Sequence, residues 1–185
     1  MTTTKKNKYA GIGARGTPPH IMEVEFELGK ILAKEGWVLR SGHAAGSDMA
    51  FEDGCLKGKG EMEIYLPYPK FNGAPKDDPR YIANITNEMQ ALASTVVPHW
   101  GNCNGAARKF HSRNCCQILG RDLDEPVNMV LCWTINGDVV GGTATGITLA
   151  QRMDIPVFNL GFKSWANYEH PRKAADEIME WVNKL

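Results

Sequence analysis

The sequence has no long apolar run, no excess of charge of one sign, and no low-complexity segment or internal repeat. No stretch approaches the roughly 20 apolar residues that cross a bilayer, so we expect no membrane contact. Lys plus Arg and Asp plus Glu each number 21, which gives a formal net charge of zero. Proteins that hold nucleic acid through its phosphates are usually basic, so this balance argues against a nucleic-acid partner.

Signals for secretion are also missing. Residues 1–8 are polar and contain three lysines but no apolar core, so we expect a flexible N-terminus and no signal peptide. The five cysteines are an odd number and follow no framework spacing. Reduced thiols in a cytoplasmic protein fit both observations best.

Histidine and cysteine do not form a recognisable metal motif. His99, Cys103, His111 and Cys115 could be gathered into a zinc site, but their Cys-x7-His-x3-Cys spacing matches no common pattern. We therefore predict unrelated core and loop residues, with neither a metal nor a resident cofactor.

The sequence does contain a regular alternation of short apolar runs and amphipathic segments. A chain of 185 residues is expected to form one domain. The alternation predicts a three-layer α/β Rossmann-like fold with a mainly parallel central sheet, closed by a C-terminal helix within residues 161–185. We also predict a helix over residues 81–92, a short strand or extended link over 95–97, and a surface loop over 68–79 that is either a lid or an insertion.

The most informative stretch runs from an apolar strand at residues 37–40 through a small, polar loop into a helix. Gly42 and Gly46 allow the backbone to approach a ligand closely, and free N–H groups at a helix start favour a phosphate. Ser41 and Ser47 add hydroxyl donors, and Ser47 is also a plausible N-cap. Asp48 would repel phosphate and suits ribose hydroxyls, so the expected ligand is a nucleotide.

Two further glycine loops, at residues 11–15 and 141–146, also follow predicted strands. The carboxyl ends of parallel strands share one edge of a sheet, so all three loops are expected at one ligand site. Residues 11–16 also match the dinucleotide pattern G-x-G-x-x-G, which makes an NAD site a competing interpretation. No strand ends in an acidic residue at the expected offset of about 20 residues, which argues against NAD.

Together, the segments 11–15, 41–48 and 141–146 resemble the SLOG superfamily of Rossmann-like nucleotide-binding proteins, and the resemblance extends over residues 9–160. This superfamily includes the LOG cytokinin-activating hydrolases, the DNA-processing DprA proteins and nucleotide-sensing domains of antiviral systems. The resemblance implies a nucleotide site at the carboxyl edge of the sheet, and a homodimer or higher homo-oligomer paired through helices.

The LOG hydrolases carry a His-Glu-Arg-Lys stretch and a Gly-Gly-x-Gly-Thr-x-x-Glu loop, to which residues 111–114 and 141–148 are similar. Arg113 matches the arginine of that family. Thr148 stands where the family has its acid–base glutamate, and threonine cannot replace a carboxylate at neutral pH. The resemblance therefore implies nucleotide binding and puts LOG-type hydrolysis in doubt.

Two functional classes follow from these residues. The first is a protein that senses or sequesters a nucleotide or a nucleotide-derived, including cyclic, signal. The second is an N-glycoside hydrolase of nucleoside 5'-monophosphates, in which Asp48, Asp138 or Glu88 supplies the carboxylate and Arg113 is a further catalytic candidate. The expected ligand-binding residues are Gly13, Arg15, Ser41, Gly42, Ala45, Gly46, Ser47, Asp48, Arg113, Gly141, Gly142, Thr143 and Thr145.

Overall fold

The central sheet has six strands, and every neighbouring pair runs parallel. The computed structural model describes residues 5–162 and 170–185, so residues 1–4 of the predicted flexible N-terminus lie outside the described part. The strand order is β4-β3-β2-β1-β5-β6. The strands are β1 (Lys8–Gly13), β2 (Val38–Ser41), β3 (Glu61–Tyr65), β4 (Tyr81–Ile82), β5 (Met129–Trp133) and β6 (Val157–Asn159).

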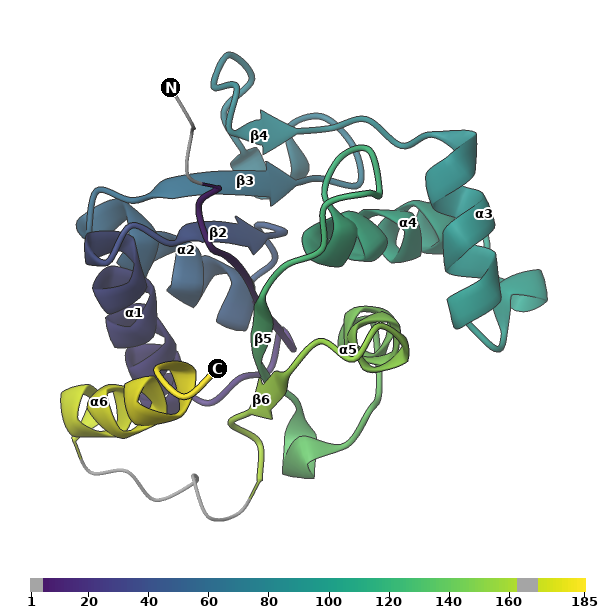
Figure 1. The fold of residues 1–185 in the computed structure, drawn as a ribbon. Coiled ribbons are helices and arrows are strands. Elements are labelled where there is room, and N and C mark those ends of the chain that lie inside the picture. The colour runs from purple at the N-terminus through teal and green to yellow at the C-terminus, as the bar shows by residue number, and fades with distance from the viewer. Residues whose placement is uncertain (1–4, 163–169) are drawn as a thin grey trace.

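Helices cover both faces of this sheet, which confirms the predicted three-layer α/β fold (Figure 1). On one face lie α1 (Pro19–Lys34), α2 (Ser47–Lys57) and α6 (Pro171–Val182), with α1 packed against both others. On the opposite face lie α3 (Asn87–Val96), α4 (Gly105–Leu119) and α5 (Thr143–Arg152). The chain turns from one side of β1 to the other between β4 and β5, so the topological switch point lies beside β1.

The sequence explains how closely these layers pack. The apolar positions of α1 recur at helical spacing, and Val24, Leu28 and Leu32 are fully buried against the sheet. A Cβ at Gly11 of β1 would lie 2.6 Å from the Phe51 side chain of α2. Only glycine at this position lets α2 lie so close to the central strand.

Residues 81–92 do not form the single helix that we predicted from the sequence. Their first two residues pair with β3 as the edge strand β4, and α3 begins only at Asn87. Thr86 determines this start, because its side chain accepts a hydrogen bond from Met89 N (3.3 Å). The helix continues to Val96, and only Val97, its C-cap, has the extended backbone that we predicted for residues 95–97, which form no strand.

The segment 68–79 is a largely exposed surface loop, as predicted, and it is anchored to the domain at Phe71 and Ala74. It contains the 3-10 turn η1 (Phe71–Gly73), and Phe71 is 3% exposed, with its ring 5.5 Å from that of Phe110 on α4. Asn72 Nδ2 donates a hydrogen bond to the His43 carbonyl (3.0 Å). The loop therefore supports α4 and the β2–α2 connection.

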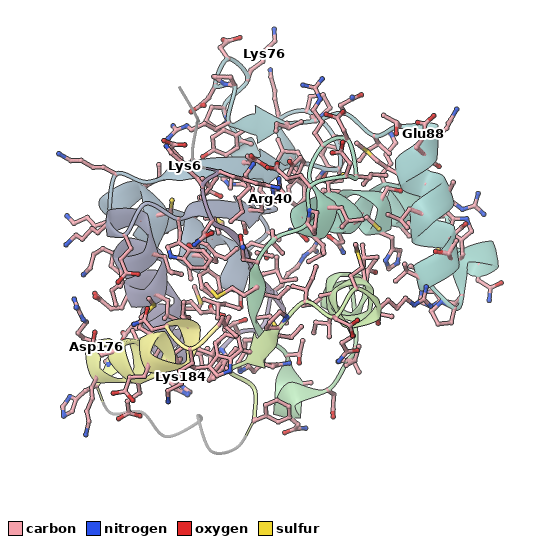
Figure 2. The ribbon with its side chains drawn as sticks, in the orientation of Figure 1. Lys6, Arg40, Lys76, Glu88, Asp176 and Lys184 are labelled. Carbon is pink, nitrogen blue, oxygen red and sulfur yellow. The ribbon has the colours of Figure 1, made fainter. Side chains whose placement is uncertain are left out.

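A buried ion network joins β2 and β3 to the segment that precedes β5. Arg40 is 1% exposed, and it donates from Nε to Glu63 Oε2 (2.6 Å) and from Nη2 to Glu125 Oε2 (2.7 Å). Figure 2 shows Arg40 among the packed side chains between these strands. By contrast, Lys6 pairs with Glu61 where both side chains are more than half exposed.

All five cysteines are free thiols in the structure. Within residues 5–162 and 170–185, every helix is too short or too polar to cross a membrane.

Candidate functional site

A cavity of about 740 Å³ opens at the carboxyl edge of the sheet, beside the switch point. Its walls come from the end of β1 and the following loop, from one side of α4, and from the segment between β5 and α5. The lining residues are Ile12, Gly13, Ala14, Arg15, Gly16, Ala44, Asp48, His99, Ala107, Phe110, His111, Arg113, Asn114, Gln117, Trp133, Ile135, Val140, Gly141, Gly142 and Thr143. This is the edge at which α/β proteins bind ligands.

A buried ion pair lies at the base of the cavity. Arg113 Nη1 is 3.4 Å from Asp48 Oδ2, and each side chain is 5% exposed. Asp48 Oδ1 accepts a hydrogen bond from Gly13 N (3.2 Å), which ties the start of α2 to the end of β1. The pair therefore connects three of the elements that form the cavity.

Burial raises the pKa of Asp48. Arg113 and the N–H groups of Ala44 and Gly13 oppose this shift, because they stabilise the carboxylate. The net effect is that Asp48 has a pKa above its ordinary value, and its carboxyl group faces the cavity. Such a group suits hydrogen bonding to a hydroxyl, and it also suits proton transfer.

The Arg113 guanidinium is held from several sides. It lies 5.8 Å from the ring centroids of both Phe71 and Phe110, within cation–π range. With its amide oxygen turned towards them, Gln117 accepts hydrogen bonds from Arg113 Nη1 (3.2 Å) and Gly42 N (3.1 Å). A Cβ at Gly42 would lie 1.2 Å from Arg113 Nη1, so the arginine needs glycine there.

The structure brings seven of the predicted ligand-binding residues to the cavity. They come from the first and third glycine loops, from the start of α2 and from α4. These residues are Gly13, Arg15, Asp48, Arg113, Gly141, Gly142 and Thr143. Arg15 is exposed and lies 5.6 Å from the Phe110 ring centroid, which keeps its charge at the cavity wall.

The serines predicted as ligand donors do not line the cavity. Ser41 Oγ donates to the Gly11 carbonyl (2.6 Å), and Ser47 Oγ donates to Glu25 Oε1 (2.7 Å). Ser47 is not the N-cap either, because α2 begins at Ser47 and Gly46 is the capping residue. Both hydroxyls therefore serve the packing of the β2–α2 connection.

Four other predicted residues also lie outside the cavity lining. Gly42 accommodates Arg113, and Gly46 has φ +87° with its Cβ position only 2.3 Å from the Ala14 carbonyl oxygen. Ala45 is exposed, whereas Thr145 is buried. Of the central glycine loop, residues 41–48, only Ala44 and Asp48 thus line the cavity, whereas Gly42 and Gly46 allow close packing behind it.

Aromatic and amide side chains of the cavity were absent from the sequence prediction. Phe110 and Asn114 lie on α4, and Trp133 ends β5. Asn114 Nδ2 donates to the Gly142 carbonyl (2.7 Å), which fixes the start of α5 beside α4. Helical spacing places Phe110, three residues before Arg113, on the same side of α4, but only the fold shows that this side faces a cavity.

The first turn of α5 contributes backbone to the cavity wall. Gly142 is its N-cap and Thr143 its first residue, while the preceding Gly141 has φ +67°. The first turn of a helix attracts anions through its dipole, and here Ala144 N and Thr145 N also donate long hydrogen bonds to the Gly141 and Gly142 carbonyls (3.3 Å each). Among the described residues that line the cavity, Asp48 is the only acidic one.

Three of the four residues considered as metal ligands do lie together. One ring nitrogen each of His99 and His111 and the Cys103 sulfur lie within 4.8 Å of one another. Cys115 is fully buried among the apolar residues of the core and lies outside this group. Burial, followed by the neighbouring His99, lowers the pKa of His111, so its imidazole is predominantly neutral at pH 7. The expectation that His99, Cys103, His111 and Cys115 are unrelated in space was therefore wrong for the first three.

No family model and no curated protein matches this sequence. Among solved structures, the chain is similar to the molybdenum cofactor carrier protein of Chlamydomonas reinhardtii, with a TM-score of 0.55 and 17% identity over 98% of this chain and 86% of that chain. It is also similar to DNA processing protein A from Helicobacter pylori, with a TM-score of 0.51 and 16% identity over 94% and 80% of the two chains. At such identities the likeness shows the fold alone. The chain shares the Rossmann-like α/β fold of these structures, as the alternation of strands, glycine loops and helices predicted.

Proposed function

We propose that the protein binds a nucleotide, or a related cofactor-like molecule that contains phosphate, in the cavity at the carboxyl edge of the sheet. In this proposal it senses, sequesters or carries that molecule. The observation that carries the proposal is the cavity itself, which combines an aromatic wall, an exposed arginine and the N-terminal end of α5.

The apolar part of the cavity suits a planar ring. Phe110 and Trp133 supply aromatic surface, and Ile12, Ile135 and Val140 supply aliphatic surface. Rings of this kind stack on aromatic side chains and on guanidinium planes. A nucleotide base or a similar planar ring would therefore be held by contacts that depend little on its hydrogen-bonding pattern.

The polar part suits a phosphate and a sugar. Arg15 and the first turn of α5 lie on the same cavity, and both favour an anion. Asp48 lies deeper and would accept hydrogen bonds from ribose hydroxyls. The end of β2 is Ser41, which is not acidic, and this favours the proposal over a dinucleotide site of the NAD type.

The comparison with known structures is compatible with a binding role. The similar Chlamydomonas protein is named as a carrier of the molybdenum cofactor, and the similar Helicobacter protein is described by its binding of single-stranded DNA. Neutral formal charge in this chain favours a small molecule over DNA.

Native mass spectrometry of the purified protein tests the proposal. It is followed by calorimetric titration with nucleoside monophosphates, NAD, cyclic ADP-ribose, cyclic dinucleotides and a single-stranded oligonucleotide. We expect one small phosphate-containing ligand to bind intact, and Arg15→Met to weaken it about 10-fold or more, since a charge-assisted hydrogen bond contributes roughly 1.5–3 kcal/mol.

Arg121→Met is the matched control, because Arg121 is an exposed arginine beyond the end of α4 and outside the cavity lining. Affinity unchanged in Arg15→Met, or tight binding of the oligonucleotide alone, would refute the proposed site. The predicted homodimer or higher homo-oligomer stays a prediction, which sedimentation velocity measures directly.

A second candidate function is N-glycoside hydrolysis of a nucleoside 5'-monophosphate. The observation that favours it is the placement of Asp48, a buried carboxyl with a raised pKa in the cavity. Asp138 is exposed after the turn that follows β5, and Glu88 is exposed on α3 (Figure 2). Free base released by the parent protein and lost in Asp48→Asn would establish this activity, and retention of intact nucleotide over hours would exclude it.

A further inference from the structure

We propose that His99, Cys103 and His111 form a binding site for a zinc-type divalent cation at the rim of the cavity. Two histidine nitrogens and one cysteine sulfur lie within 4.8 Å of one another. A tetrahedral zinc site with bonds of about 2.0–2.3 Å has its ligand atoms roughly 3.3–3.8 Å apart, so small side-chain rotations complete the geometry.

A single short turn presents two of these ligands. His99 and Cys103 flank the 3-10 turn η2 (Trp100–Asn102) as its capping residues, so their side chains emerge from the same region of backbone. Backbone hydrogen bonds close this turn, from Asn102 N to the His99 carbonyl (2.9 Å) and from Cys103 N to the Trp100 carbonyl (3.1 Å). The ligands therefore belong to a backbone unit that exists without the metal.

Helix α4 holds this turn in place. Arg108 stacks on Trp100, with its guanidinium carbon 5.3 Å from the ring centroid. Asn104 caps the helix by accepting a hydrogen bond from Ala107 N (2.9 Å). These contacts bring the turn over the first half of α4, where His111 completes the cluster.

The third ligand is oriented by a hydrogen bond of the kind found behind metal-bound histidines. His111 Nδ1 lies 2.8 Å from Thr145 Oγ1 of α5. This leaves Nε2 of His111 for a cation and fixes the plane of the ring. Thr145 was predicted as a ligand-binding residue, and in this arrangement it acts as a positioning residue behind His111.

The donor set selects the type of cation. Imidazole nitrogen with one thiolate suits zinc and neighbouring late transition metals, and it does not suit Mg²⁺ or Ca²⁺, which prefer oxygen. Three protein ligands leave a fourth position. His99 and His111 both line the cavity, so this position faces the proposed ligand site and would hold a water molecule or an oxygen of a bound molecule.

Metal titration of the purified, reduced protein tests the site without any nucleotide, so its outcome is independent of the proposed function. We expect one Zn²⁺ per chain by calorimetry. Co²⁺ should give the absorption of a tetrahedral thiolate complex. The other four cysteines are 0–1% exposed, so a thiolate signal reports Cys103. Binding of Co²⁺ without a thiolate band would overturn the assignment of Cys103, as would the absence of stoichiometric Zn²⁺ binding.

Variants of the cluster provide the second measurement. His99→Gln, Cys103→Ser and His111→Gln should each weaken Zn²⁺ binding more than about 100-fold, and Thr145→Val about 10- to 100-fold, as is typical for groups behind a ligand. His20→Gln is the matched control, because His20 is exposed on α1. Circular dichroism checks that each variant is folded. Unchanged Zn²⁺ affinity in Cys103→Ser would refute the proposal, as would equal losses in His20→Gln.

Discussion

A methyl group added at Gly42 tests how the Asp48–Arg113 pair is held in place. The new Cβ would lie 1.2 Å from Arg113 Nη1, so the guanidinium could not keep its position beside Asp48. Breaking a buried ion pair costs about 3–5 kcal/mol, because a charge is left without its partner. Arg113 can swing towards the open cavity and regain some hydration, so we expect Gly42→Ala to lower the free energy of unfolding by about 2–4 kcal/mol.

Urea unfolding followed by circular dichroism measures this loss. With a slope of about 2 kcal/mol per molar urea, the unfolding midpoint should fall by about 1–2 M. Gly105→Ala is the matched control, because Gly105 begins the helix that carries Arg113 and has nothing within 4 Å of its Cβ position. We expect a change below about 1 kcal/mol in that control.

The same substitution in an Arg113→Ala background separates the side-chain clash from a backbone effect. Without the guanidinium, the added methyl group meets chiefly the flexible end of Gln117, so its cost should fall below about 1 kcal/mol. An equal loss of stability with and without Arg113 would show that the reasoning from the ion pair is wrong.

Two further predictions concern buried charges away from the cavity. Glu25 is fully buried, its pKa is raised by burial, and Oε2 has no hydrogen-bond partner in the described part of the chain. A carboxyl with a raised folded-state pKa contributes stability that is complete below its unfolded value and is lost as the pH rises, so the parent should lose stability from about pH 5 upwards. Glu25→Gln should reduce this loss, and parallel stability curves for parent and variant between about pH 5 and 8 would contradict the assignment. Arg40→Met should lower the free energy of unfolding by about 1–3 kcal/mol, because it removes the buried partner of Glu63 and Glu125, which are partly exposed and stay paired with Lys8. Lys6→Met, which removes an exposed ion pair, should change it by less than about 1 kcal/mol, and similar losses in the two variants would count against the role of burial.

The fold class could be predicted from the sequence because its determinants are local. Apolar runs of strand length alternate with helical apolar stripes, as in α1, and parallel strands follow from that alternation. The position of the site at the carboxyl edge follows in turn, since every predicted glycine loop comes after a strand. Local pattern failed at residues 81–92, where pairing with β3 and the Thr86 cap outweighed the helical periodicity.

Which polar side chains face the cavity was decided by the tertiary structure. Ser41 and Ser47 have the residue type and the position of ligand donors. Their hydroxyl groups instead donate hydrogen bonds to Gly11 and Glu25, which are distant in the sequence. A buried hydroxyl must find a partner, and the partner that folding brings nearest determines where it points. Gly42 likewise serves Arg113 of α4.

The cluster of His99, Cys103 and His111 shows the same division. The sequence determines that these residues occur within one short segment, but their spacing matches no common metal motif. Only the stacking of Arg108 on Trp100 and the packing of α4 against α5 bring their ligand atoms together. Sequence by itself thus determined the layers, the strand–loop–helix order and the edge that carries the cavity. The tertiary structure decided which side chains meet there, because such contacts depend on how separate elements pack.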